Sequence, residues 1–188
     1  MNQYVNEILD IINENLDDAA AFLSNKVYSE FVYLYMDSYA LFDEIINKYS
    51  KESTNLFIGI RDQLPAPIYD IIAIDILERE SFDNYLTPKT SIDSVINYIP
   101  ENSIKELSNL HELKEKKDFR TIIISLLRSY SHVFRASNNA DVIETTRQYL
   151  ARQIEVSVMF TEANTNTIDY NPFLKTDTLF DSYIDTLF

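Results

Sequence analysis

Hydrophobic residues recur every three or four positions along most of the chain, the spacing that places them on one face of an α-helix. The first stretch with this spacing predicts a helix from about Gln3 to Ser24, and the second predicts a helix from Val27 to Tyr49. The short apolar segment Leu56 to Ile60 is too brief to be assigned to a helix or a strand. The amino-terminal third of the chain is therefore predicted to contain two long amphipathic helices.

The same spacing continues through the middle of the chain, where turn and capping signals mark helix ends. Pro65 and Pro67, which favour a first helical turn, precede an apolar helix. Thr90 and Asp93 have the spacing of a capping box, and Pro100 ends that short helix. Further helices are predicted from 102 or 103 to about 113, over 117–136 and from 140 to about 161. Because no segment alternates cleanly in the period of a strand, we predict an all-α fold, a helical bundle of five to seven helices.

Residues 163–188 have a different pattern, rich in Asn, Thr and Asp with widely spaced large apolar residues. We therefore divide the chain into a helical bundle over 1–162 and an extended C-terminal docking arm over 163–188. Ordering the backbone of such a segment costs more than burial of its apolar side chains contributes. The arm is expected to need backbone hydrogen bonds to a host surface, on its own bundle, on a sister subunit or on a different protein.

The arm contains a short repeat: residues 177–180 read Asp-Thr-Leu-Phe, and so do residues 185–188. An offset of eight is even, so in an extended chain both Leu-Phe pairs face the same side and suit a groove or a sheet edge. We expect the large apolar residues of the arm to bind the partner. They are Tyr170, Phe173, Leu174, Leu179, Phe180, Tyr183, Ile184, Leu187 and Phe188.

The residue inventory argues against catalysis and against bound cofactors. The chain has no cysteine, one glycine (Gly59) and two histidines, which excludes thiol catalysis, cysteine metal sites and glycine-rich phosphate loops. His111 is followed by a glutamate, as in zinc protease helices, but Glu115 stands where the second histidine ligand is required. Neighbouring acidic residues are expected on solvated helix faces; they are Asp17/Asp18, Asp43/Glu44, Glu78/Glu80 and Glu112/Glu115. We predict a non-enzymatic protein with no catalytic, cofactor or metal site.

The net charge of −14 is unevenly distributed along the chain. Residues 1–104 carry 18 acidic and 6 basic groups, whereas residues 105–152 carry 6 acidic and 9 basic groups. The acidic surface keeps the protein soluble and repels nucleic acid, so direct nucleic-acid binding is not expected. Lys116, Lys117 and Arg120 form a possible charged interface, although the acids interleaved with them also fit a salt-bridged helix surface.

No apolar run approaches the roughly 20 residues that span a bilayer, and the first residues do not resemble a signal peptide. We expect no membrane partner and a cytoplasmic location, in the host cell or in a virion if a phage encodes the chain. The abundance of Ile, Asn and Tyr, which have AT-rich codons, fits a bacterial, phage or viral origin.

A helical body followed by an arm resembles the adaptor, or connector, proteins that join the portal of a tailed phage to its tail. That resemblance covers the general architecture, helices to about Thr161 and then the arm from Asn164 to Phe188. It implies a multi-copy structural subunit whose arms reach into neighbouring subunits. The expected partners are further copies of this chain, in a homo-oligomer, and neighbouring assembly proteins.

Two alternative functions remain open. Residues 183–188 are similar to the short C-terminal peptides by which polymerases and accessory factors hold a sliding clamp, which implies a replication or late-transcription accessory factor; Tyr183 replaces the glutamine of bacterial versions. The acidic first half of the chain instead fits an inhibitor that mimics nucleic acid and predicts salt-sensitive binding to a DNA- or RNA-binding enzyme.

Overall fold

The computed structural model describes residues 2–78 and 119–165. Within these ranges the chain forms the α-helices α1 (Gln3–Ser24), α2 (Tyr28–Lys48), α3 (Lys51–Arg61), α4 (Pro65–Glu78), α8 (Phe119–Ala136) and α9 (Ala140–Thr165). Helices are the only regular secondary structure across these two ranges, so the prediction of an all-α bundle is confirmed. The helices predicted over 90–100 and 102–113 lie outside the described residues, as does the arm beyond residue 165.

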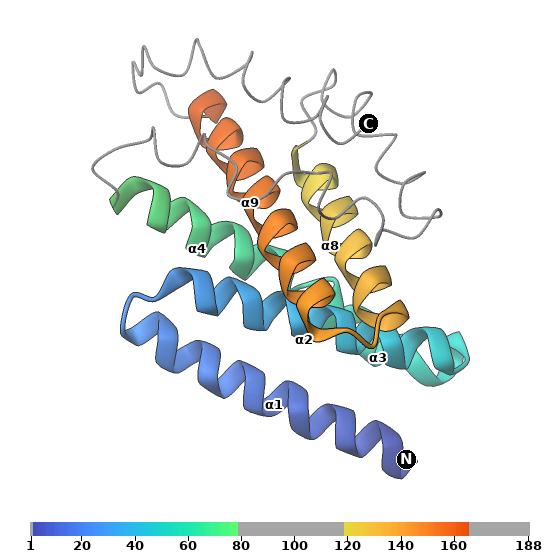
Figure 1. Cartoon of the computed structure of the whole chain (residues 1–188). Helices are drawn as coiled ribbons and strands as arrows, with labels where there is room; N and C mark the ends of the chain where they lie inside the picture. Colours follow the sequence, from blue (N-terminus) through green and yellow to red (C-terminus); the bar gives the residue numbers. More distant parts are fainter. Residues whose placement is uncertain (1, 79–118, 166–188) are drawn as a thin grey trace.

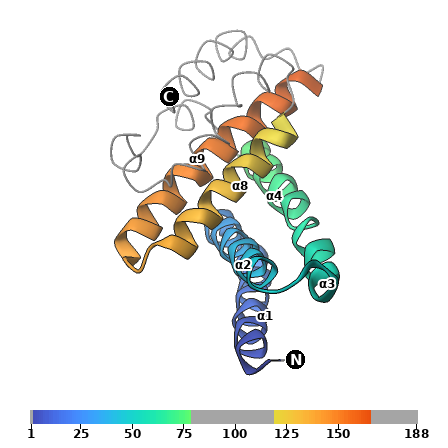
Figure 2. The same ribbon diagram turned by 90° about the vertical axis from the view of Figure 1, so that its right-hand side faces the viewer.

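Helix α2 is the centre of the bundle and contacts each of the other helices in the described part of the chain. Helix α1 lies alongside α2 in a hairpin, and α8 and α9 form a second hairpin that crosses α2 on the side away from α1 (Figure 1 and Figure 2). Helix α4 packs against α2 and α9, whereas α3 lies at one end of the bundle against α2. Two helix hairpins therefore meet along the length of α2.

Helix α1 shows why the apolar spacing predicts its bounds so well. Asn2 caps its first turn by accepting a hydrogen bond from the backbone of Tyr4 at 3.2 Å. Val5, Ile8 and Ile12 are buried against α2 on the face that the sequence pattern marks as apolar. After Ser24 the chain turns through Lys26, whose φ of 58° lies in the left-handed region that ends many helices.

The two hairpins share one hydrophobic core. Its largest fully buried side chains include Tyr39, Met36 and Ile45 from α2 and Tyr130 and Ile122 from α8. Because α2 is surrounded, residues on several of its faces are buried, including the polar side chains of Ser38 and Asp43.

Among the helices of residues 2–78 and 119–165, none combines the length and the apolar character that a membrane span requires.

Two elements differ from the sequence prediction. The segment 56–60, too short to be assigned from the sequence, belongs to α3, in which Leu56 and Ile60 are exposed and Phe57 is half-buried. Helix α9 continues to Thr165, beyond the expected end near Thr161 and into the segment assigned to the arm. Neither glycine nor proline interrupts residues 161–165, and Glu162 and Ala163 both favour a helix.

Candidate functional site

The residues predicted to bind a partner fall largely outside the described ranges. All the predicted anchors of the arm, from Tyr170 to Phe188, lie there, as do Lys116 and Lys117 of the possible charged interface. Arg120 lies in the first turn of α8, and its side chain is not among those described. The interactions of these side chains therefore stay predictions. The described bundle contains two polar clusters that were not predicted from the sequence.

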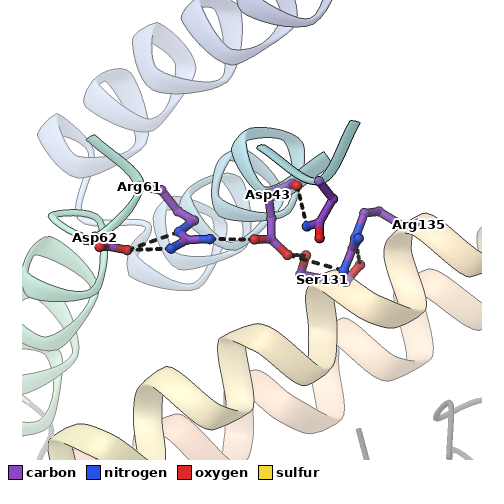
Figure 3. Close-up of polar contacts among 6 residues, drawn as sticks. Asp43, Arg61, Asp62, Ser131 and Arg135 are labelled. Atoms are coloured by element: carbon purple, nitrogen blue, oxygen red, sulfur yellow. Dashed lines mark hydrogen bonds and ion pairs between the residues drawn. The ribbon is translucent and has the colours of Figure 1, made fainter. Parts of the chain in front are cut away.

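The first cluster surrounds Asp43, a residue of α2 that is only 6% exposed. Its carboxylate accepts hydrogen bonds from Nη1 of Arg61 at 2.6 Å and from Oγ of Ser131 at 2.7 Å, and Nη2 of Arg135 lies 3.3 Å away (Figure 3). Arg61 ends α3, and the other two residues belong to α8. The expectation that the Asp43/Glu44 pair lies on a solvated face is wrong for Asp43, because α2 is covered on that side by α3 and α8.

Arg61 remains charged in this environment. Burial lowers the pKa of its guanidinium, but hydrogen bonds to Asp62 and Asp43, with the negative potential of Tyr39, raise the pKa above its ordinary value. The guanidinium also lies over the ring of Tyr39, 5.7 Å from the centroid. Two arginines and a hydroxyl group thus surround one buried carboxylate, an arrangement that fixes three helices relative to each other.

The second cluster surrounds Asp37, six residues earlier on α2. The hydroxyl of Tyr130 on α8 donates a hydrogen bond to its Oδ1, and Nη1 of Arg147 on α9 lies 2.7 Å from its Oδ2. Arg147 also binds Glu144 and lies 4.9 Å from the centroid of the Tyr33 ring. Asp37 therefore ties the α8–α9 hairpin to α2, as Asp43 ties α3 and α8 to the same helix.

Burial shifts the pKa of both groups that meet at Asp37. Burial raises the pKa of Asp37, opposed by the hydrogen bond from Tyr130 and by the charge of Arg147. Burial and the adjacent carboxylate raise the pKa of Tyr130 far above its ordinary value, so this hydroxyl keeps its proton and acts as a donor. The contacts of this cluster connect α2, α8 and α9, so these groups hold the three helices together.

A sequence signal for the carboxylates of both clusters does exist. Asp37 comes three residues after Leu34 and four before Leu41, and Asp43 comes four after Tyr39. These spacings place each acid on an apolar face of a helix. An acidic residue is rarely buried on such a face unless a hydrogen-bond donor or a positive charge pairs with it. The identity of the partners cannot be derived from spacing, because they lie 18 to 110 positions away along the chain.

A polar cleft of about 510 Å³ lies between α2, α4 and α9. Its lining includes Glu30, Asp75, Glu144 and Glu155, of which Glu144 binds Arg147 and Glu155 binds Nη1 of the buried Arg152 at 2.7 Å. In the described ranges no group of three or more His, Cys, Asp or Glu side chains is placed to hold a metal ion. His132 is half-buried in α8. Two of the carboxylates that line this cleft are therefore paired with arginines of α9.

The outer face of α3 is the most exposed apolar feature in the described ranges. Leu56 is 71% exposed and Ile60, one turn later, is 37% exposed. Gly59 lies between them, and a Cβ atom added there would meet nothing within 4 Å. A glycine inside a helix costs roughly 0.5–1 kcal/mol relative to alanine. The described fold gives no steric reason for that cost.

Comparison with known proteins assigns no relative: neither a family model, nor a curated protein, nor a solved structure matches the chain. Function must therefore be argued from the residues and their arrangement.

Proposed function

We propose that this chain is a non-enzymatic structural adaptor, a multi-copy subunit of a larger complex that docks through its C-terminal arm. Connector proteins of tailed phages are the type of assembly that the architecture of the sequence resembles. The partners in this proposal are other copies of the chain and neighbouring assembly proteins.

The observation that carries the proposal is the commitment of two carboxylates, the buried Asp43 and the half-buried Asp37, to contacts between helices. Asp37 and Asp43 are each held by an arginine and a hydroxyl group from other helices. Such groups make a rigid support and are not poised for catalysis, since each already has its hydrogen-bond donors in place. A rigid helical support beside a segment rich in spaced apolar anchors favours an assembly role over an enzymatic one.

The experiment tests the Leu-Phe pairs of the repeat in the full chain. We expect replacement of Leu179, Phe180, Leu187 and Phe188 by alanine to reduce the molar mass observed by sedimentation velocity. The matched control replaces Thr178 and Thr186 of the same repeat by alanine and should assemble as the unmodified chain does. An unmodified chain that stays monomeric, or a quadruple variant that assembles normally, would contradict the proposal.

A second candidate function is favoured by the outer face of α1. Glu7, Asp10, Glu14, Asp17 and Asp18 are all exposed, and α1 contains no basic residue. A helix with this one-sided negative charge suits an inhibitor that competes with nucleic acid for a basic surface.

Inhibition assays against a panel of nucleases and polymerases test this alternative. Salt-sensitive inhibition that disappears in the variant Asp10→Asn, Glu14→Gln, Asp17→Asn would support it. Absence of inhibition at low salt, or inhibition that neither salt nor the variant changes, would exclude it.

A further inference from the structure

The solvent-facing side of α3 carries a regular pattern of residues that the bundle itself does not use. Glu52, Leu56, Gly59, Ile60 and Gln63 follow one another at intervals of four, three, one and three, the spacing of a single helix face. All five are exposed, and Gln63 follows α3 directly in the turn that leads to α4. This face, which we call the α3 face, has an apolar centre between one acidic and one amide end.

Gly59 gives the α3 face a shape as well as an apolar character. It is the one glycine in 188 residues and its φ is not positive. Apart from its chain neighbours and its own helix backbone, no atom of the described residues lies within 4 Å of the position that a Cβ would take. Neither a turn nor close packing within the bundle requires a glycine there. Because Gly59 has no side chain, a large side chain from outside could approach the helix backbone closely between the exposed Leu56 and Ile60.

The polar ends of the face favour one direction of packing for a second copy of α3. If a second α3 packs antiparallel, Glu52 of each copy lies opposite Gln63 of the other, and each carboxylate accepts a hydrogen bond from an amide. In the same register Leu56 of each copy lies opposite Gly59 of the other. A parallel pair would instead place Glu52 against Glu52 of the second copy, which is unfavourable because like charges repel.

We propose that the α3 face is a contact between two copies of this chain, packed antiparallel about a twofold axis with Leu56 of one copy over Gly59 of the other. This inference rests on the proposed function for the need for a self-contact, and it names the surface that makes it. A twofold contact uses the same residues on both sides, as the pattern of this face allows.

The expected contact is small and therefore weak in isolation. Helix α3 has 11 residues, a length of about 16 Å at about 1.5 Å per residue. A helix of this length buries less than the roughly 800 Å² per partner of a standard stable interface. We therefore expect a concentration-dependent dimer, which other contacts of a multi-copy assembly strengthen through the high local concentration of subunits.

Sedimentation equilibrium of the full chain tests the position of the contact. Leu56→Lys, at a 71% exposed position, should weaken self-association about tenfold or more, because a charge enters the apolar centre. The matched control Ile11→Lys changes an apolar residue of α1 that is 47% exposed and should associate as the unmodified chain does. Equal loss in both variants, or no loss in Leu56→Lys, would overturn the proposal.

Charge exchange tests the antiparallel register. Gln63→Glu places two carboxylates opposite each other and should weaken association, whereas Glu52→Lys combined with Gln63→Glu creates two ion pairs and should restore it. In a parallel pair the double variant would keep two like-charged pairs, as the single variant does, so association would not be restored, and that result would overturn the antiparallel register. Urea unfolding of each variant in dilute solution confirms that these exposed changes leave the fold intact.

Failure of this inference is distinguishable from failure of the proposed function. If the unmodified chain assembles and Leu56→Lys assembles equally well, the α3 contact is wrong while the adaptor function stands. If the unmodified chain is monomeric at every concentration, both are wrong.

Discussion

Asp43 on α2 and Arg61 at the end of α3 place Oδ1 and Nη1 2.6 Å apart, with side chains that are 9% and 15% exposed. The same carboxylate also meets Arg135 of α8 at 3.3 Å. One buried negative charge therefore balances two positive charges that arrive from different helices. Neither arginine is well solvated. Removing the carboxylate while both arginines remain is therefore expected to lower the free energy of unfolding.

The variant Asp43→Asn keeps the shape of the side chain and removes its charge. We expect the free energy of unfolding to fall by about 2–4 kcal/mol, because two partly buried guanidinium groups lose their shared counter-charge. Urea denaturation monitored by circular dichroism measures this change.

The control Asp62→Asn removes another partner of the same arginine, a carboxylate that is 57% exposed and 2.9 Å from Nη2 of Arg61. Its expected cost is below about 1 kcal/mol, since exposed ion pairs contribute little. Equal costs for the two variants would contradict the role assigned to Asp43.

The second prediction concerns the pH dependence of stability at Asp37, which faces Tyr130 of α8 and Arg147 and Glu144 of α9. Burial raises the pKa of Asp37 above its ordinary value of 3.8. Between 3.8 and the raised pKa the folded protein binds more protons than the unfolded chain, so the free energy of unfolding falls as pH rises. Asp37→Asn lacks this titration and serves as the reference.

We therefore expect the stability of the unmodified chain relative to Asp37→Asn to decrease as pH rises from about 4 and to become constant above the raised pKa. Urea unfolding of both proteins at a series of pH values measures the difference. A relative stability that increases with pH would show that Arg147 outweighs burial and lowers the pKa of Asp37.

The third prediction separates folding from association at Gly59. Gly59→Ala should raise the free energy of unfolding of the monomer by roughly 0.5–1 kcal/mol, because alanine favours a helix and its Cβ meets no neighbour. The same variant should weaken self-association, since the added methyl group occupies the space that Gly59 leaves open between Leu56 and Ile60. Urea unfolding in dilute solution and sedimentation at high concentration measure the two effects.

We therefore expect Gly59→Ala to raise the free energy of unfolding and to weaken self-association. A variant that is more stable and associates as the unmodified chain does would mean that the glycine serves no contact. A less stable monomer would mean that the packing around α3 is tighter than the structure indicates.

The apolar spacing predicts the helices that bury one continuous stripe. Helix α1 has the predicted bounds because Asn2 caps it and its buried residues, among them Val5, Ile8 and Ile12, repeat every three or four positions. Helix α3 escapes the same reasoning, because Leu56 and Ile60 face solvent while the half-buried Phe57 packs near Phe42, at 6.3 Å between ring centroids. Sequence spacing alone does not distinguish an exposed apolar residue from one that is buried in the core.

The polar clusters could be predicted in part. The position of Asp37 and Asp43 on apolar faces of α2 is visible in the sequence, but their neighbours Arg147 and Ser131 are 110 and 88 residues away. Only the fold brings them together. The anchors of the predicted arm lie beyond the described residues, and the docking role of Leu187 and Phe188 stays a prediction from their repeat.

The molar mass of the unmodified full chain, measured by sedimentation velocity over about a hundredfold range of concentration, tests the assembly role most directly. A subunit that works by contacts with its own copies should sediment as species heavier than its 22.0 kDa monomer, in a proportion that rises with concentration. A single 22.0 kDa species at every concentration would contradict the account.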